Sequence, residues 1–168
     1  DGCLACEENY DCIHKDEMNY INNQLLNSDI LIISTPVYFD NVPGIFKNFI
    51  DRTNPICNKM KGKKAVVITF GQADEISWNN ATQYINTYFD ILGISVIGKY
   101  SFNARNKFDA SNNNDIKNKI DSLLKTEKKY AFSAYTFIAD AVPYTVKSLS
   151  KERHVTAVEL VNGVKKFA

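Results

Sequence analysis

The stretch Ile30–Arg52, ILIISTPVYFDNVPGIFKNFIDR, joins an apolar run to a helical pattern through a short loop of aromatic and polar residues. The run is apolar without alternation, which is typical of a parallel strand buried on both faces. Pro36 ends it and favours an extended conformation at Thr35. Pro43 suits the first turn of a helix, and apolar residues then recur at helical spacing. The stretch therefore predicts a strand, a loop and a helix in close succession.

The same alternation of apolar runs and helical patterns continues on either side. Three apolar strands are predicted, at Asp29–Ser34, Ala65–Phe70 and Ile94–Gly98. A helix with Asp16 as N-cap precedes the first strand, and a longer helix capped by Ser77 and ended by Gly93 joins the second to the third. This order predicts an α/β fold with a parallel sheet and helices on both faces.

The composition narrows the classes of function. The 168 residues include 20 basic and 19 acidic side chains, so the formal net charge is only +1. This balance argues against a nucleic acid or a membrane surface as partner. No apolar run is as long as a membrane span and no signal-peptide pattern opens the chain, so we expect a cytoplasmic protein. The chain begins at Asp1 and stops at Ala168 within a helical pattern, and we interpret it as a fragment or a processed piece.

The C-terminal part follows an Asn-rich linker, Asn103–Asp115. Apolar residues at helical spacing predict helices over Ile116–Leu124 and Tyr135–Leu149. Thr156–Glu159 has the pattern of a capping box and predicts the start of a last helix. We therefore divide the chain into an α/β domain over residues 1–129 and a helical segment over residues 130–168.

The loop Thr35–Asn41 is the first candidate site. Ligands of open parallel α/β sheets bind where the carboxyl ends of the strands meet the following loops. Backbone groups after Pro36 cannot all pair within the sheet, so they are available to a planar polar ligand, and Tyr38 or Phe39 can flank its face. The structural alternative, in which the aromatic residues only cover the edge of the sheet, stays open.

From about Asp1 to about Phe102 the chain resembles the NADPH-dependent FMN reductase and iron–sulfur flavoprotein group. The most specific matches are Pro36, Val37, Tyr38, Phe39, Asn41, Val42, Gly44, Lys47, Phe49, Ile50, Asp51 and Arg52. The resemblance implies a flavodoxin-like fold, FMN as cofactor and NAD(P)H as co-substrate. It also implies that two loops enclose the flavin ring, one with Thr35, Pro36, Val37, Tyr38, Phe39 and Asn41, and the other with Phe70, Gly71 and Gln72.

The chain also departs from this family. The family's first strand, which is central in the usual strand order, and the loop that binds the FMN phosphate have no match here, so we expect a sheet that lacks its middle strand. We also expect this chain to bind FMN weakly. Asp40 stands where the family commonly has Gly, and Asp tolerates a positive φ better than most residues. From about Tyr130 the chain is faintly similar to a small bacterial helical domain of unknown function.

The cysteines follow the pattern Cys3-x2-Cys6-x5-Cys12. Disulfides are disfavoured in a cytoplasmic chain, and both zinc sites and iron–sulfur clusters usually need four ligands. The resembling family often has a fourth cysteine upstream, so the resemblance makes these three candidate ligands of a 4Fe-4S cluster. A compact thiol-rich turn is the alternative. In either case we expect them to lie together near the flavin side of the sheet, whereas Cys57 has no assigned role.

These observations favour a flavin-dependent oxidoreductase that moves electrons from a reduced nicotinamide to a small-molecule acceptor. We predict no catalytic side chain, because the flavin supplies the chemistry and neither His14 nor His154 has a visible partner. We interpret Asp51 and Arg52 at the predicted helix end as a carboxylate–guanidinium pair that ties down a neighbouring loop, rather than as an acid or cation with a functional role. Two alternatives remain, an electron-transfer protein with FMN and an iron–sulfur cluster, and a non-enzymatic binding or assembly module. We expect a homo-oligomer.

Overall fold

The computed structural model describes residues 3–9, 12–72 and 75–106, then 109, 113–115, 118–119 and 122, and three strands beyond residue 129. Six described strands form one sheet in the order β3-β2-β1-β4-β5-β6. Their bounds are β1 Ile30–Pro36, β2 Lys64–Gly71, β3 Ser95–Asn103, β4 Tyr130–Ala134, β5 Val155–Val161 and β6 Val164–Phe167.

The first three strands are parallel, as the sequence predicts. In β1 and β2 the register runs from Ile30 opposite Lys64 to Pro36 opposite Phe70. β2 pairs with β3 in the same direction, and Gly71 lies opposite Asn103. The carboxyl ends of the three strands therefore meet at one edge of the sheet, where the loops that follow them come together.

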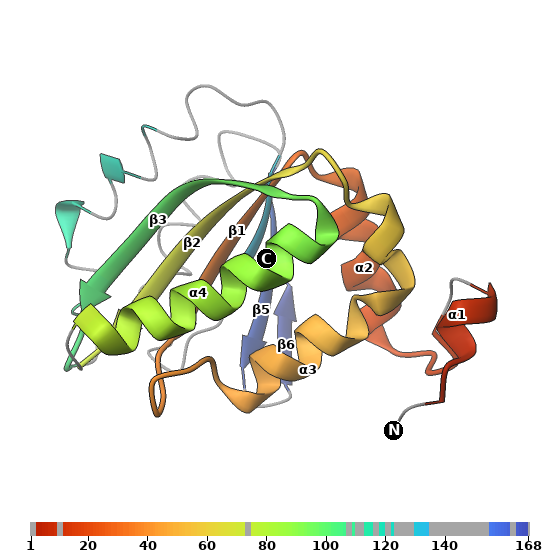
Figure 1. Ribbon diagram of the computed structural model, residues 1–168, viewed down its shortest axis with the longest axis horizontal. Helices are drawn as coiled ribbons and strands as arrows, with labels where there is room; N and C mark the ends of the chain where they lie inside the picture. The colour runs from red at the N-terminus through yellow and green to blue at the C-terminus, as the bar shows by residue number, and fades with distance from the viewer. Residues whose placement is uncertain are drawn as a thin grey trace.

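Three helices cover one face of β1 and β2. They are α2 Glu17–Asn27, α3 Gly44–Arg52 and α4 Glu75–Leu92, and α3 and α4 lie in front of the sheet in Figure 1. They share one hydrophobic core with alternate residues of the strands, such as Leu31 and Val67. The residues between these, such as Ile32 and Val66, are buried on the opposite face, as the unbroken apolar runs predict.

The helix ends agree with the sequence at two positions and differ at one. Asp16 is the N-cap of α2, and its side chain accepts a hydrogen bond of 3.0 Å from the Met18 amide. Gly93 follows α4 with a φ of +67°, a conformation that glycine adopts readily. The prediction that Ser77 caps α4 is wrong, since this helix begins at Glu75 and Ser77 lies inside its first turn.

The C-terminal part contains strands where the sequence predicts a helix. Thr156–Glu159 lies inside β5, because β-branched residues fill four of its seven positions and the pairing with β4 and β6 outweighs the local capping pattern. β4 and β5 are parallel, and β6 is antiparallel to β5. β4 also pairs with β1, so β1 has a neighbour on each side, contrary to the expected gap in the sheet. Most of Ile116–Leu124 and all of Tyr135–Leu149 lie outside the described residues.

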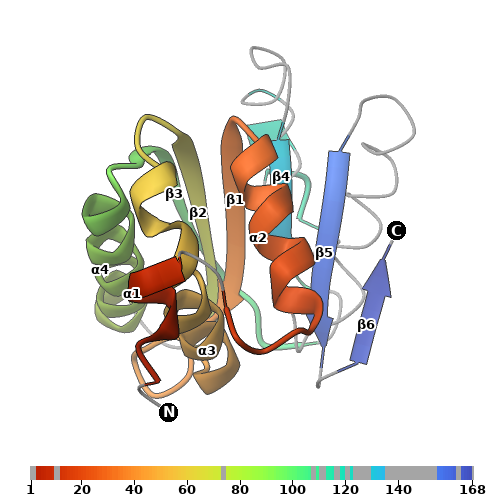
Figure 2. The ribbon, with the colours of Figure 1, turned by 90° about the vertical axis from the view of Figure 1, so that its right-hand side faces the viewer.

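Two short helices complete the N-terminal part. α1 spans Ala5–Asn9 where we expected irregular structure, and the 3-10 helix η1 spans Asn54–Lys59 after α3. Figure 2 shows α1 in front of the other helices, on the side of the molecule away from β6. Within the described residues, none of the helices has the length and apolar character of a membrane span.

Candidate functional site

A pocket of about 780 Å³ lies at the carboxyl ends of β1, β2 and β3. Its walls are residues 36–39 and 42–44 after β1, residues 70–72 at the end of β2, and residues 104–106 after β3. This is where open parallel sheets bind their ligands, and the volume is within the roughly 300–1,000 Å³ of small-molecule sites.

The structure brings most of the candidate flavin-binding residues to this pocket. Seven of the nine line it, namely Pro36, Val37, Tyr38, Phe39, Phe70, Gly71 and Gln72. Thr35 is fully buried, and its hydroxyl donates a 3.1 Å hydrogen bond to the Pro36 carbonyl. Asn41 uses its side-chain oxygen to accept a 2.7 Å hydrogen bond from the Val42 amide. Binding by each of the nine stays a prediction, and these two side chains are engaged within their own loop.

Backbone hydrogen bonds join the three loops into one floor. The Val37 amide donates to the Phe70 carbonyl over 2.7 Å. The Ala104 amide donates to the Gly71 carbonyl over 3.1 Å, which continues the sheet pairing past the end of β3. The pocket therefore has a backbone fixed by the sheet, as a preorganised binding site requires.

The rim of the pocket is a tight turn at Tyr38–Asn41. Tyr38 and Asn41 exchange backbone hydrogen bonds of 2.9 and 3.0 Å, and the two residues between them, Phe39 and Asp40, have φ values of +49° and +60°. Positive φ at both central positions defines a type I′ turn. Asp40 has the positive φ that we expect an aspartate to tolerate at this position, whereas the sequence does not predict a positive φ at Phe39.

Phe39 is unusual for its residue type. A left-handed backbone costs a residue with a side chain about 1–2 kcal/mol, and the exposure of Phe39 is 104% of its reference value. The turn is held against α4 by a short hydrogen bond from the Ser77 hydroxyl to the Asp40 carboxylate. The structure thus keeps an aromatic ring in open solvent at the pocket, in a strained conformation, which is typical of binding sites.

Gly71, at the end of β2, is another lining residue of the pocket. A Cβ atom placed on Gly71 would lie 2.8 Å from Nε1 of Trp78 and 3.4 Å from Cβ of Val37. Trp78 is the only tryptophan of the chain, and its Nε1 is buried without a hydrogen-bond partner among the described residues. Glycine is required at position 71 because the indole already occupies the space of a side chain.

Residues 104–106 belong to the site although the sequence did not indicate them. The third strand was expected to end at Gly98, but β3 continues to Asn103 and carries the following loop to the pocket. The sequence signal for this longer strand is the alternation of the aromatic residues Tyr100 and Phe102 with polar residues, which the structure shows to be exposed. An alternating pattern indicates an edge strand, whereas unbroken apolar runs indicate only strands that are buried on both faces.

Asp109 organises the loop after β3. Its Oδ2 accepts hydrogen bonds from the backbone amides of Asn106 and Arg105, at 2.8 and 2.9 Å. These two hydrogen bonds hold the pKa of the Asp109 carboxyl below its ordinary value, and the bond from the Asn106 amide has the larger effect.

We expect this loop to loosen in acid. Because the pKa is lowered, the carboxylate stabilises the loop fully at pH values above the ordinary pKa of aspartate. This contribution to stability disappears as the pH falls through the lowered pKa. Hydrogen exchange of the Arg105 and Asn106 amides should therefore become faster at low pH, after correction for intrinsic rates. In an Asp109→Ala variant the exchange should be fast throughout, while the Ala104 amide, bonded to Gly71, stays protected. Equal protection in the variant and the unchanged chain would contradict this role.

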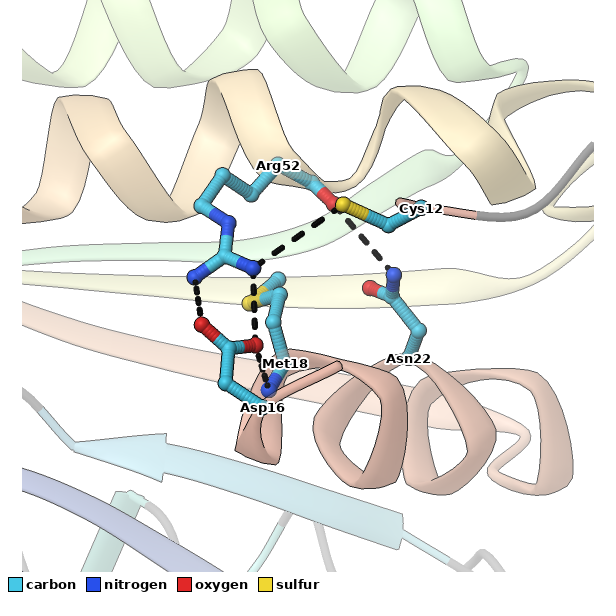
Figure 3. Close-up of polar contacts among 5 residues, drawn as sticks. All are labelled: Cys12, Asp16, Met18, Asn22 and Arg52. Carbon is cyan, nitrogen blue, oxygen red and sulfur yellow. Dashed lines mark hydrogen bonds and ion pairs between the residues drawn. The ribbon is translucent and has the colours of Figure 1, made fainter. Parts of the chain in front are cut away.

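Arg52 ties the segment before α2 to the end of α3 (Figure 3). Its guanidinium donates to both oxygens of Asp16, at 2.8 and 2.7 Å, and Nη2 lies 4.0 Å from the sulfur of Cys12. Asp51 pairs with Lys47 within α3 instead. These contacts fit the structural role that the sequence analysis gave to Arg52, with Asp16 as the residue that it holds.

The helix that carries Cys6 does not lie at the flavin side of the sheet, where we expected the three cysteines. Cys6 is on α1, beside η1, and its sulfur accepts a 3.1 Å hydrogen bond from the Asn54 side chain. Figure 1 shows α1 beyond the end of α3, away from the loop that follows β1. Among the described residues, no three Cys, His, Asp or Glu side chains are arranged to hold a metal ion, and none of the four cysteines forms a disulfide. As they lie, Cys3, Cys6 and Cys12 do not form the ligand set of a 4Fe-4S cluster, and this role stays a prediction.

Comparison with known families places the site in context. A family model described as NADPH-dependent FMN reductase matches residues 2–109, which is more than half of the chain and includes every residue of the pocket. The chain belongs to the NADPH-dependent FMN reductase family. This membership confirms the predicted resemblance.

The curated proteins to which the chain is similar include iron–sulfur flavoproteins. One from Methanocaldococcus jannaschii is 33% identical over 110 residues, which cover 61% of this chain and 56% of that relative. One from Clostridioides difficile is 29% identical over 135 residues, or 78% of this chain and 56% of that relative. The chain thus matches little more than half the length of these two relatives.

Solved structures support the fold. The Trp repressor binding protein from Bacillus subtilis superposes with a TM-score of 0.57 at 24% identity, over 67% of this chain and 78% of that one. The apo form of an NADH:FMN oxidoreductase gives a TM-score of 0.54 at 18% identity, over 68% of this chain and 59% of that one. These similarities confirm the predicted flavodoxin-like α/β fold.

Proposed function

We propose that this member of the NADPH-dependent FMN reductase family contributes the flavin site of an oxidoreductase. In this proposal FMN lies in the pocket at the carboxyl ends of β1, β2 and β3, with its ring between residues 35–41 and residues 70–72. A reduced nicotinamide is the electron donor, and a small molecule is the acceptor. The observation that carries the proposal is a pocket lined by the exposed aromatic turn after β1 and by Gly71 at the end of β2, in a chain that matches the family over these residues.

The residues of the pocket suit a planar aromatic ligand. Gly71 presents backbone to the pocket with the Trp78 indole packed against it, and Phe39 and Tyr38 offer aromatic surface at the rim. Burial raises the pKa of the Tyr38 phenol above its ordinary value. Bound FMN would supply the chemistry of accepting a hydride and passing on electrons. The chain's own part is to bind the ring, orient it and limit the access of water.

Anaerobic addition of NADH or NADPH to the FMN-loaded chain tests this proposal. We expect the visible absorbance of the flavin to bleach faster than that of free FMN at the same concentration, because the site orients the two molecules for hydride transfer. Readmission of air or addition of a quinone should restore the absorbance. Equal rates with and without the chain would reject an oxidoreductase function for it, and the ratio of the NADH and NADPH rates gives the preferred donor.

Electron transfer through an iron–sulfur cluster is the second candidate. It is supported by the relatives named iron–sulfur flavoproteins and by the three cysteines near the N-terminus. The arrangement of the described cysteines does not support it. Iron and acid-labile sulfide, measured after anaerobic purification, separate the two candidates, because only the second requires them. A cytoplasmic location and a homo-oligomer complete the proposal, and sedimentation velocity tests the latter.

A further inference from the structure

The pocket has a polar side that the proposed flavin ring does not explain. The loop after β1 contributes apolar and aromatic residues, whereas the loops after β2 and β3 contribute Gln72, Arg105 and Asn106. Among the described residues that line the pocket, Arg105 is the only one with a charged side chain. A cation among lining residues that are otherwise uncharged favours an anionic group on the ligand.

The backbone at Arg105 is fixed from three directions. Its amide donates to Oδ2 of Asp109, and its carbonyl accepts a 3.1 Å hydrogen bond from the Gln72 side chain. On either side of it, the Ala104 amide is bonded to Gly71 and the Asn106 amide to Asp109. The side chain thus leaves from a preorganised point on the wall, which lowers the entropy lost when it binds a ligand.

The guanidinium itself is available. Arg105 is exposed, and within the described part of the chain no ion pair or hydrogen bond engages its guanidinium. The nearest acid in the loop, Asp109, directs its Oδ2 to the backbone amides. Arg52 offers a contrast, because both of its terminal nitrogens are bound to Asp16.

We propose that Arg105 binds a phosphate group of the ligand in this pocket, with Asn106 and Gln72 beside it. The inference rests on the proposed function, since it concerns the same site. Guanidinium presents two parallel N–H groups that match the oxygens of a phosphate, and it stays charged at every physiological pH. Two sources of that phosphate are compatible with the site, the phosphate of FMN and the pyrophosphate of the reduced nicotinamide dinucleotide.

The test compares Arg105→Gln and Arg105→Lys with the unchanged chain. Lys99→Gln is the matched control, because it removes the same charge from an exposed position of β3 that does not line the pocket. The dissociation constants of FMN and riboflavin, which differ only in the phosphate, are measured together with the KM for NADH. We expect Arg105→Gln to weaken phosphate-bearing ligands about tenfold at low salt, as for one charge-assisted hydrogen bond near the surface. Arg105→Lys should be intermediate, and added salt should reduce the difference.

Each outcome is decisive. Weaker FMN binding with unchanged riboflavin binding assigns Arg105 to the flavin phosphate, and a raised KM for NADH alone assigns it to the dinucleotide. The inference would be overturned if Arg105→Gln weakened the binding of riboflavin as much as that of FMN, or if its effect were no larger than that of Lys99→Gln. Flavin binding by the unchanged chain would in that case still uphold the proposed function. Absence of binding of both flavins and of NADH to the unchanged chain would reject both.

Discussion

Replacing Gly71 with valine should destabilise the protein by about 1–3 kcal/mol and remove most of its affinity for flavin. The new Cβ would lie 2.8 Å from Nε1 of Trp78, a distance that real contacts essentially never show. Backbone and indole must then move apart at the floor of the pocket, where Gly71 also accepts the hydrogen bond from Ala104. Urea unfolding followed by far-ultraviolet circular dichroism measures the first effect, and FMN titration measures the second.

Two variants control this result. Gly44 also lines the pocket, but a Cβ there meets nothing within 4 Å, so Gly44→Ala should leave the free energy of unfolding unchanged or slightly raised. Trp78→Leu should relieve the collision, so that Gly71→Val costs less in that background. If Gly71→Val is equally harmful with leucine at position 78, the close approach of the indole is not the reason for glycine.

Replacing Phe39 with glycine should move stability and binding in opposite directions. Relative to Phe39→Ala, the glycine variant should be about 1 kcal/mol more stable, because glycine has no side chain to strain at a φ of +49°. The higher chain entropy of unfolded glycine opposes part of this gain. Both variants lose the exposed ring, so both should bind FMN about tenfold more weakly than the unchanged chain, as expected for one lost stacking contact.

The comparison of the two Phe39 variants with the unchanged chain separates strain from binding. Phe39→Ala keeps the left-handed position and loses only the ring, so it is the matched control. Equal stability of the two variants would show that the turn does not hold position 39 in a strained conformation. Unchanged FMN affinity in both would show that the flavin ring does not lie against Phe39.

Much of the fold was predictable because its first part depends on unbroken apolar runs. Strands buried on both faces leave such a signal, and β1 and β2 fall within two residues of their predicted ends. The edge strand β3 leaves a weaker, alternating signal, which is why Arg105 and its loop were missed. The positive φ of Phe39 was not predictable from its residue type, since local propensity disfavours it and the pairing of Tyr38 with Asn41 imposes it.

The C-terminal strands show the limit of helical periodicity. The capping-box pattern at Thr156 describes only one helical turn, whereas β5 gains pairing with strands on both of its sides. The cysteines illustrate a second limit, because their spacing along the chain does not reveal that α1 lies against η1. Both corrections concern contacts between residues that are far apart in the sequence.

Titration of FMN into the purified chain, followed by the fluorescence of Trp78, tests the central claim most directly. Because this single tryptophan touches Gly71 at the wall of the pocket, a flavin ring bound there should quench its emission by energy transfer. We expect saturable quenching that is weakened in Phe39→Ala. We also expect an affinity roughly two to four orders of magnitude below that of a site with a complete phosphate loop, if two charge-assisted hydrogen bonds are missing. Quenching that never saturates, or saturable quenching that Phe39→Ala and Gly71→Val leave unchanged, would contradict a flavin site between these two loops.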